Sequence, residues 1–544
     1  MSSYTDFLYG LPPQKMWGER VYTTNDFQYP DKLNAVVELL DKHVAEGRAA
    51  NTAIYYKDQI LSYGELAEMV AKMGNALRKL GVEQGDRILL RFPNNLTAVA
   101  IWLATLRIGA VAVMVMPMLR ARELYYRSND SECSLVLCDA ASIDEIRKAE
   151  PALDTVKTIL ICDGKDERYK SFEDLWLTES HECEAANTSR SDVALIGYTS
   201  GSTGDPKGTV HFQDDVLAIA DGYAKNILAP TEKDIFSGHP SLSFTFGLGG
   251  LLVFPFRFGA ATVLLDQFTP ENMLKTLVDY KCTISFCAPT CYNMMMRLDE
   301  EGKFDLTHLR VGVSAGETLP KTVFDKWKTK YGTELLDGIG STEMLHIFIS
   351  NFPGEAQGGV TGKPVPGYEA KIIDDNGNDV PDGTPGLLAI KGPTGCRYLK
   401  KIERQEGYVK NGWNIPGDVF MRNADGTFTY QCRNDDLIVT GGYNVSPPEL
   451  EAVINEHEAV KESAVVPKPD DLRGQIVKAY CVLMPGVEAT EDLAKNIQDH
   501  VKRELAPYKY PREVEFIEAL PRTDTGKVQR FVLRDKAMGK VASL

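Results

Sequence analysis

The chain has 544 residues, of which 43% are hydrophobic and 25% charged. It is therefore long enough to form about three or four compact units with large cores. Its formal net charge of −16 argues against broad binding to nucleic acids or anionic membranes, because both depend on basic surfaces. The ten cysteines are scattered without the paired C-x-x-C spacing of zinc or redox sites, and the polar, acidic start lacks a secretory leader. These features predict a cytoplasmic protein with reduced core thiols.

The first part of the chain alternates helical and strand patterns. Ser62 and Glu65 form a capping box, and apolar residues then repeat at helical spacing up to Gly81, where a helix C-cap belongs. Short strands are expected at 87–92, 110–116, 135–138 and 158–162. Strands separated by helices of this length imply βαβ units and parallel sheets.

One stretch, 98–118, is apolar enough to raise the question of a membrane span. Arg107 and Gly109 interrupt it and Pro117 ends it. A buried helix followed by a buried strand explains this pattern better than a single spanning helix. We therefore expect no membrane insertion.

A glycine-rich segment, Tyr198 to Gly208, follows a strand-type run at 193–196. Backbone N–H groups, hydroxyls and the ammonium of Lys207 can converge there on a polyphosphate. The segment is not a Walker A loop, because that pattern needs Ser or Thr directly after the lysine. A loose Gly/Ser/Thr cluster could equally be a surface loop. The ordered string Gly-Ser-Thr-Gly-x-Pro-Lys-Gly, however, would arise by chance in about one in a million chains of this length.

The second half contains two further regions. Strands are expected at 260–265, 283–288 and 311–314, with a helix at 271–280, and short strands with Gly/Pro/Asn/Asp turns follow Gly354. Beyond 433–436, helices at 449–455 and 491–505 alternate with strands at 463–466 and 478–483. We predict an α/β protein. Its large N-terminal domain (1–435) combines parallel-type βαβ sheets with a small barrel-like β unit, and its small, mobile α/β C-terminal domain spans 436–544.

The glycine-rich string resembles the phosphate loop of the adenylate-forming superfamily, which includes acyl-CoA ligases, luciferases and peptide-synthetase adenylation domains. Three further stretches resemble superfamily motifs in the same order along the chain. They are the adenine and α-phosphate turn at 338–343, the ribose motif at 413–418 and the lysine motif at 521–527. The ribose motif departs from the family pattern, which usually has Thr before Gly-Asp where this chain has Pro416.

The resemblance implies ATP, Mg²⁺ and coenzyme A as the cofactors, and roles for individual residues. Thr342 would bind phosphate, Glu343 would act as the metal-side acid, and Lys527 would be the catalytic lysine. Asp435 would be the hinge, and pantetheine would lie beside Gly441, Gly442 and Tyr443. The remaining ATP and AMP contacts would be Thr199, Ser200, Gly201, Ser202, Thr203, Gly204, Lys207, Gly316, Glu317, Thr318, Asp337, Gly338, Ile339, Gly340, Ser341, Asp418 and Arg433. Outside these motifs, Glu343 and Lys527 would both be read as solvated charges.

The implied reaction has two halves. A carboxylate and Mg-ATP give acyl-AMP and pyrophosphate, and a thiol then displaces AMP to form a thioester. A cation is needed in the first half because two anions meet and negative charge builds on the phosphoryl oxygens. A positioned lysine reduces that repulsion.

The stretch 337–348 looks like the benzoate-CoA ligase group, and 244–250 is similar to 2-aminobenzoate-CoA ligases. By that resemblance the acyl pocket would contain Phe244, Thr245, Phe246, Gly247, Ile339 and His346. From spacing alone, ordinary core packing explains Phe244, Phe246 and His346 better. Benzoate, aminobenzoate, cyclohexane- or cyclohexenecarboxylate and short branched acids are not separated on this basis, since one methylene alters discrimination by only about 1–3 kcal/mol.

Other activities fit part of the pattern. A short- or branched-chain acyl-CoA synthetase, run forward or in reverse to make ATP, shares all the motifs. Transfer to a carrier-protein thiol would predict a neighbouring carrier domain, and none is visible. A luciferase-like oxygenase shares the first half-reaction. A non-catalytic relative would be expected to lack Lys207, Glu343, Asp418 or Lys527, and all four are present. The large enzymes that the chain resembles suggest a homodimer.

Overall fold

The computed structural model describes residues 10–199, 206–440, 443–470, 474–505, 509–522 and 528–540. By packing, the chain divides into two compact units, one made of Met1–Ala370 and Ile390–Asn414 and the other of Lys371–Ala389 and Ile415–Leu544. The division passes through strand β18 (Pro385–Lys391). It reflects packing density and not motion, so the predicted domain boundary and hinge at 435 stay predictions.

The first unit contains a seven-stranded sheet in the order β7-β6-β5-β3-β4-β8-β9. All neighbours are parallel except the β8–β9 pair. The strands are β3 (Arg87–Arg91), β4 (Val111–Val115), β5 (Leu135–Asp139), β6 (Thr158–Cys162), β7 (Lys170–Ser171), β8 (Val193–Thr199) and β9 (Lys207–Phe212). The strands predicted at 87–92, 110–116, 135–138 and 158–162 are therefore confirmed, as is their parallel pairing.

A nine-stranded sheet in the same unit has the order β16-β15-β14-β13-β12-β10-β11-β1-β2, with a parallel centre from β14 to β1. Its strands are β1 (Thr52–Tyr56), β2 (Gln59–Ser62), β10 (Ile235–Gly238), β11 (Ala261–Val263), β12 (Ile284–Cys287), β13 (Val311–Ala315), β14 (Glu334–Gly340), β15 (Ile347–Ser350) and β16 (Lys363–Pro364). Parallel strands are buried on both faces, which explains their near-continuous apolar sequences.

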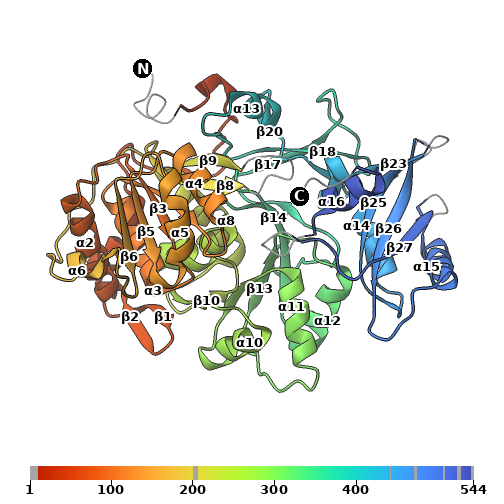
Figure 1. The fold of residues 1–544 in the computed structure, drawn as a ribbon, viewed down its shortest axis with the longest axis horizontal. Coiled ribbons are helices and arrows are strands. Elements are labelled where there is room, and N and C mark those ends of the chain that lie inside the picture. The colour runs from red at the N-terminus through yellow and green to blue at the C-terminus, as the bar shows by residue number, and fades with distance from the viewer. Residues whose placement is uncertain are drawn as a thin grey trace. The chain divides into compact units, whose positions relative to one another are not determined.

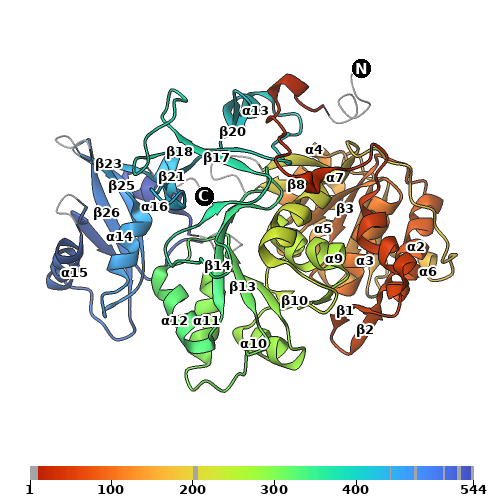
Figure 2. The same ribbon diagram turned by 180° about the vertical axis from the view of Figure 1, so that it is seen from behind.

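Helices cover both faces of these sheets (Figures 1 and 2). Right-handed crossovers require α3 on one face of the seven-stranded sheet and α4 and α5 on the other, because the chain reverses direction across the sheet after β4. The helices of this unit are α2 (Tyr63–Lys79), α3 (Leu96–Arg107), α4 (Ala121–Asp130), α5 (Ile143–Ala149), α6 (Glu173–Trp176), α7 (Gln213–Ile219), α8 (Thr245–Leu248), α9 (Phe254–Phe258), α10 (Pro270–Asp279), α11 (Pro289–Leu298), α12 (Lys321–Tyr331) and α13 (Ile402–Tyr408).

The predicted capping box is present at the start of α2. Ser62 accepts a hydrogen bond from the Glu65 backbone N–H, and the Glu65 carboxylate accepts one from the Ser62 N–H at 2.8 Å. Gly81, one residue past the C-cap, has φ +81°, as a left-handed helix stop requires. The apolar stretch 98–118 forms α3 and β4, so the buried helix-and-strand interpretation is confirmed. No helix among the described residues is long and apolar enough to cross a membrane.

The second unit begins with short antiparallel strands. Residues 385–387 of β18 pair with β21 (Asp418–Arg422), which pairs in turn with β22 (Phe428–Arg433), and β17 (Glu369–Ile373) also pairs with β18. Two short strands on the first unit's side of the division, β19 (Val409–Lys410) and β20 (Trp413–Asn414), form a hairpin. These are the short antiparallel strands expected after Gly354.

The C-terminal part of the second unit has its own α/β core. Its sheet has the order β25-β26-β27, and β23 and β24 form a hairpin. The elements are β23 (Ile438–Thr440), β24 (Tyr443–Val445), α14 (Pro447–Ile454), β25 (Val460–Asp470), β26 (Gly474–Leu483), α15 (Glu491–Glu504), β27 (Glu513–Phe516) and α16 (Arg530–Ala537). The predicted α/β fold with a large N-terminal and a small C-terminal part is thus confirmed. All ten cysteines are buried and free, as predicted for core thiols.

Candidate active site

The glycine-rich segment connects two antiparallel strands at one side of the seven-stranded sheet. Thr199, the last residue of β8, pairs with Lys207, the first residue of β9. The hydroxyl of Tyr198 donates to the Asp130 carboxylate at 2.8 Å, and that of Tyr126 donates to the Pro206 carbonyl at 3.1 Å. Both ends of the segment are therefore fixed by the fold. Ser200, Gly201, Ser202, Thr203 and Gly204 lie outside the described residues.

The predicted phosphate and metal residues lie in the turn between β14 and β15, against this hairpin. A methyl group on Gly197 of β8 would lie 2.9 Å from Cγ2 of Thr342, so β8 passes directly over the turn. Glu343 is buried, and its Oε1 accepts a hydrogen bond from the Tyr398 hydroxyl at 2.6 Å. The Nζ of Lys207 lies 5.1 Å from the centre of the Tyr398 ring. The structure thus brings together a cation, a carboxylate and a phenol from segments far apart in sequence.

Tyr398 is a residue that the sequence analysis missed. It lies in a segment that pairs with β9, through hydrogen bonds from the Val210 N–H to the Arg397 carbonyl and from the Leu399 N–H to the Gly208 carbonyl. Burial raises the pKa of Tyr398 and the charge of Glu343 raises it further, so the phenol stays protonated and continues to donate. No local pattern around this tyrosine signals the contact, because its partner is 55 positions away in sequence.

The buried Thr199 hydroxyl points to a ligand in the same area. Its Oγ1 is shielded from solvent and has no hydrogen-bond partner among the described residues. Buried hydroxyls are normally hydrogen-bonded, because an unpaired one costs about 1–3 kcal/mol. A phosphate oxygen in the loop would supply the missing acceptor.

The other ATP residues predicted in the first unit lie at the ends of β13 and β14. These strands are parallel neighbours, with Ala315 opposite Gly338, so the segments that follow them meet at one edge of the sheet. Gly316, Glu317 and Thr318 follow β13, and Glu317 accepts a hydrogen bond from the Thr290 hydroxyl at 2.6 Å. Asp337, Gly338, Ile339 and Gly340 end β14 and lead into Ser341. Ligands of parallel sheets commonly bind at such carboxyl ends.

Asp337 is an unusual member of this set, because it is buried and its Oδ1 has no hydrogen-bond partner among the described residues. Burial raises the pKa of this carboxyl well above its usual value. Burial thus favours the neutral form of this side chain, which can donate a hydrogen bond as well as accept one.

The predicted ribose residues lie in the second unit and face each other across a strand pair. Asp418 begins β21 and Arg433 ends β22, and the two residues are opposite each other in register. Arg433 Nη1 donates to Asp418 Oδ1 at 2.9 Å. Gly417 adopts φ +81°, which only a glycine reaches without strain, so the turn forms with Pro416 in front of it. Asp435 lies in the following turn, Asn434–Asp436, and Tyr443 begins β24. Gly441, Gly442 and Lys527 lie outside the described residues.

His346 is at the centre of an aromatic cluster. Its ring lies 4.5 Å from Phe254, 5.6 Å from Tyr223, 5.9 Å from Phe246 and 6.4 Å from Phe286, measured between ring centres. Burial lowers the pKa of His346 to about 3, so the imidazole is neutral at physiological pH. Neither ring nitrogen makes a hydrogen bond to the described residues. A neutral, unpaired imidazole among aromatic rings suits contact with a flat, weakly polar ligand.

The remaining predicted acyl residues are divided between two environments. Thr245 and Phe246 are half-buried on α8, and Ile339 is half-buried on β14. Gly247 packs so closely on the Ser241 carbonyl that a methyl group there would lie 2.1 Å from its oxygen. Phe244, in contrast, packs against the hydrophobic core of the seven-stranded sheet. Phe246 is therefore grouped with His346, whereas Phe244 has the core contacts that its spacing alone suggested.

Gly249 gives a test of this cluster. A methyl group at Gly249 would lie 2.3 Å from Cδ2 of His346, so Gly249→Ala must displace the imidazole. We expect a loss of stability of about 1–3 kcal/mol from overpacking. We also expect a KM for the acid raised about tenfold or more, the equivalent of 1.4 kcal/mol. Thermal unfolding and steady-state kinetics would measure both.

Gly407→Ala is the control, since nothing lies within 4 Å of a methyl group there. An unchanged KM in Gly249→Ala would contradict a role for His346 in acid binding.

A metal ion would have to be shared with the nucleotide. Among the described residues, no group of three or more His, Cys, Asp or Glu side chains could hold a metal ion. Mg²⁺ usually binds through one or two carboxylates together with substrate phosphates, so a dedicated cluster is not required. Glu343 fits such a ligand, because Tyr398 donates to its Oε1 and no other described residue is hydrogen-bonded to this carboxylate.

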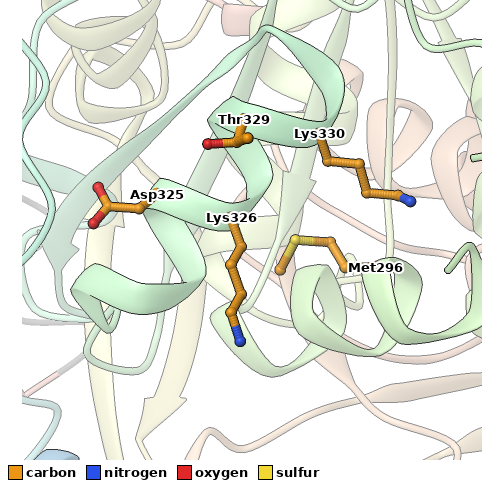
Figure 3. Close-up of a pocket in the computed structure, with 5 residues that line it drawn as sticks. All are labelled: Met296, Asp325, Lys326, Thr329 and Lys330. Carbon is orange, nitrogen blue, oxygen red and sulfur yellow. The ribbon is translucent and has the colours of Figure 1, made fainter.

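A separate hollow lies on the surface of the first unit between α11 and α12 (Figure 3). It is lined by Met296, Asp325, Lys326, Thr329 and Lys330. The Lys330 ammonium is within 3.7 Å of the Asp299 carboxylate, so this cation already has a partner. None of the predicted site residues that the structure describes lines the hollow, and we assign it no part in catalysis.

Comparison with known proteins agrees with this arrangement. A family model described as "AMP-binding enzyme" matches residues 41–398, and one described as "AMP-binding enzyme C-terminal domain" matches residues 449–527. The chain is 36% identical to the benzoate–CoA ligase of Thauera aromatica over 509 residues. This alignment covers 93% of this chain and 96% of that protein. The fold and the matches define an AMP-forming acid–thiol ligase that uses ATP and CoA. The chain belongs to the AMP-binding enzyme family.

Two solved structures show the same similarity. A crystal structure of the anthranilate CoA ligase AuaEII in complex with anthranoyl-AMP superimposes with a TM-score of 0.89 at 35% identity, covering 94% of this chain and 99% of that one. A benzoate CoA ligase from Burkholderia xenovorans LB400 gives a TM-score of 0.82 at 34% identity, covering 92% and 100%. The resemblance to benzoate- and 2-aminobenzoate-CoA ligases is thereby confirmed.

Proposed function

We propose that the protein ligates a small cyclic carboxylic acid, aromatic or alicyclic, to CoA through an acyl-AMP intermediate. The observation that carries this proposal is the aromatic cluster around His346. His346 lies three residues after Glu343, in the turn that would hold the phosphates. An acid bound against this cluster would thus have its carboxylate near the nucleotide. The relatives named as benzoate and anthranilate ligases support a ring acid.

The chain's own residues would contribute mainly by position and charge. Lys207 and the glycine-rich segment would bind the β- and γ-phosphates, and Thr199 and Thr342 would donate hydroxyl hydrogen bonds to phosphate oxygens. Glu343, oriented by Tyr398, would hold Mg²⁺, which supplies neutralisation of the polyphosphate charge when bound with ATP. Asp418 would accept hydrogen bonds from the ribose hydroxyls, with Arg433 orienting its carboxylate. Phosphoryl transfer depends chiefly on such positioning and electrostatic stabilisation.

The C-terminal part would complete each half-reaction in turn. In our proposal, Lys527 neutralises the charge that builds when the carboxylate attacks the α-phosphorus. A rotation about Asp435 then replaces Lys527 with the segment 441–443, where missing glycine side chains leave room for pantetheine. The proposed domains are accordingly 1–435 and 436–544.

A screen for pyrophosphate release over about twenty acids, with and without CoA, tests the proposal. Many acids must be compared, because one methylene changes the discrimination between two acids by only about 1–3 kcal/mol. We expect the highest kcat/KM for ring acids, with thioester formed only when CoA is present. A preference for long-chain fatty acids or short branched acids would contradict the ring pocket. Pyrophosphate release without thioester formation would contradict CoA as the acceptor.

A further inference from the structure

We propose that His211, which lies beside the buried Asp215, is a positioning residue for the Thr342–Glu343 turn. The proposal rests on the function proposed above, in which this turn binds the phosphates of ATP. Neither residue belongs to the predicted site.

His211 connects the phosphate-loop hairpin to the turn. It lies on β9, four residues after Lys207, and is 0% exposed. Its Nε2 lies 2.7 Å from the carbonyl oxygen of Thr342. A carbonyl oxygen can only accept, so Nε2 carries the hydrogen and donates it. The position of the Thr342 main chain is thus tied to the strand that carries Lys207.

Asp215 lies on the Nδ1 side of the His211 ring, opposite the contact with Thr342. It lies in the first turn of α7, fully buried, with Oδ2 at 3.7 Å from Nδ1 of His211. Asp215 accepts hydrogen bonds from Arg397 at 2.7 Å, from Arg20 at 2.9 Å and from the Phe212 N–H at 2.9 Å. Burial opposes ionisation of this carboxyl, but the two guanidinium groups lower its pKa below the usual range. Asp215 is therefore a fixed anion behind the imidazole.

A second series of contacts connects the buried ion cluster of Asp215, Arg20 and Arg397 to the turn. Arg397 is bonded to Asp215 and precedes Tyr398, whose hydroxyl donates to Glu343. The main chain of Thr342 is therefore fixed through His211, and the side chain of Glu343 is fixed through Arg397 and Tyr398. Asp215 is hydrogen-bonded to Arg397 in the second connection and lies 3.7 Å from His211 in the first.

A buried ion cluster of this kind is poorly explained by stability. Desolvation of buried charges offsets most of their attraction, and well-packed apolar residues often serve as well or better. A cluster that fixes two adjacent ligand-binding residues has a use that an apolar core could not supply. Positioning matters for phosphoryl transfer, because a misplacement of about 1 Å can cost roughly 10²-fold in rate.

The test uses two amide substitutions. Glutamine places its amide nitrogen near the position of Nε2, whereas asparagine reaches only the position of Nδ1. We expect His211→Gln to keep kcat for acyl-adenylate formation within about threefold of wild type and His211→Asn to lower it about 10- to 100-fold. The KM for the acid is expected to change little in either variant, and thermal unfolding would compare their stabilities.

His43 provides the matched control, because it is also buried and its Nε2 lies 2.5 Å from the backbone carbonyl of Phe256. His43→Gln and His43→Asn should both alter stability, and the two variants should have the same kcat. Equal kcat values for the two His211 variants would overturn the proposal, as would the same separation in the His43 pair. Absence of adenylation by the wild-type chain with every acid would instead refute the proposed function. The two failures are therefore distinguishable.

Discussion

Glu343→Gln is expected to lower kcat for acyl-adenylate formation by about 10²–10³, the usual cost of removing one preorganised electrostatic contact from a transition state. Glutamine keeps the size of the side chain but loses the negative charge that a hard cation requires. Because Tyr398 can still donate to the amide oxygen, the turn should keep its shape. The loss of kcat would be measured as pyrophosphate release at saturating acid over a range of Mg²⁺ concentrations. The Mg²⁺ concentration needed for half-maximal rate should rise.

Two further variants distinguish the loss of the Glu343 charge from a change in the structure around it. Glu355→Gln makes the same chemical change at an exposed carboxylate that pairs with Lys363 at 2.9 Å, and we expect no change in rate. Tyr398→Phe removes one hydrogen bond to Glu343 and should lower the rate about 10- to 150-fold, in line with about 1.5–3 kcal/mol for a hydrogen bond to a charged group. A Glu343→Gln enzyme with wild-type rate and an unchanged Mg²⁺ requirement would refute the metal-side role.

The regular elements were predictable because local patterns specify them. The capping box at Ser62 and Glu65 and the glycine at 81 mark the two ends of α2, and both were read directly from the sequence. The βαβ alternation gave the parallel sheets. The superfamily motifs placed Thr342 and Glu343 in a turn after a strand, which is where they lie.

Contacts between distant segments were not predictable from the same patterns. Tyr398 and His211 reach the Thr342–Glu343 turn only because the segment around 397–399 pairs with β9 and β9 packs beside the turn. A tyrosine or a histidine in a strand carries no local sign of such a partner. Phe244 and Phe246 show the same limit of sequence patterns at short range. They are only two positions apart, yet Phe244 packs against the core of the seven-stranded sheet and Phe246 lies beside His346. Periodicity predicts burial but does not identify the neighbours.

The division into packing units shows a different limit. Motifs and turn composition placed a boundary at 435, whereas packing groups residues 371–389 and 415–435 with the C-terminal segment. Asp418 and Arg433 lie in that group, so the proposed ribose residues belong to the same packing unit as the C-terminal elements. A hinge is set by where the backbone can rotate, and neither sequence composition nor packing density measures rotation.

Lys527→Ala is expected to lower the rate of acyl-adenylate formation by at least about 10²–10³, because the ammonium would offset the charge of a carboxylate meeting a triphosphate. Thioester formation from supplied acyl-AMP and CoA should be largely spared, since that half-reaction begins after pyrophosphate has left. Rapid-quench measurements of each half-reaction would separate the two effects. Lys536→Ala serves as the control, because this lysine of α16 is exposed and pairs with Glu515 at 2.7 Å. Equal loss in both half-reactions would mean that Lys527 supports the fold of the C-terminal part rather than the first chemical step.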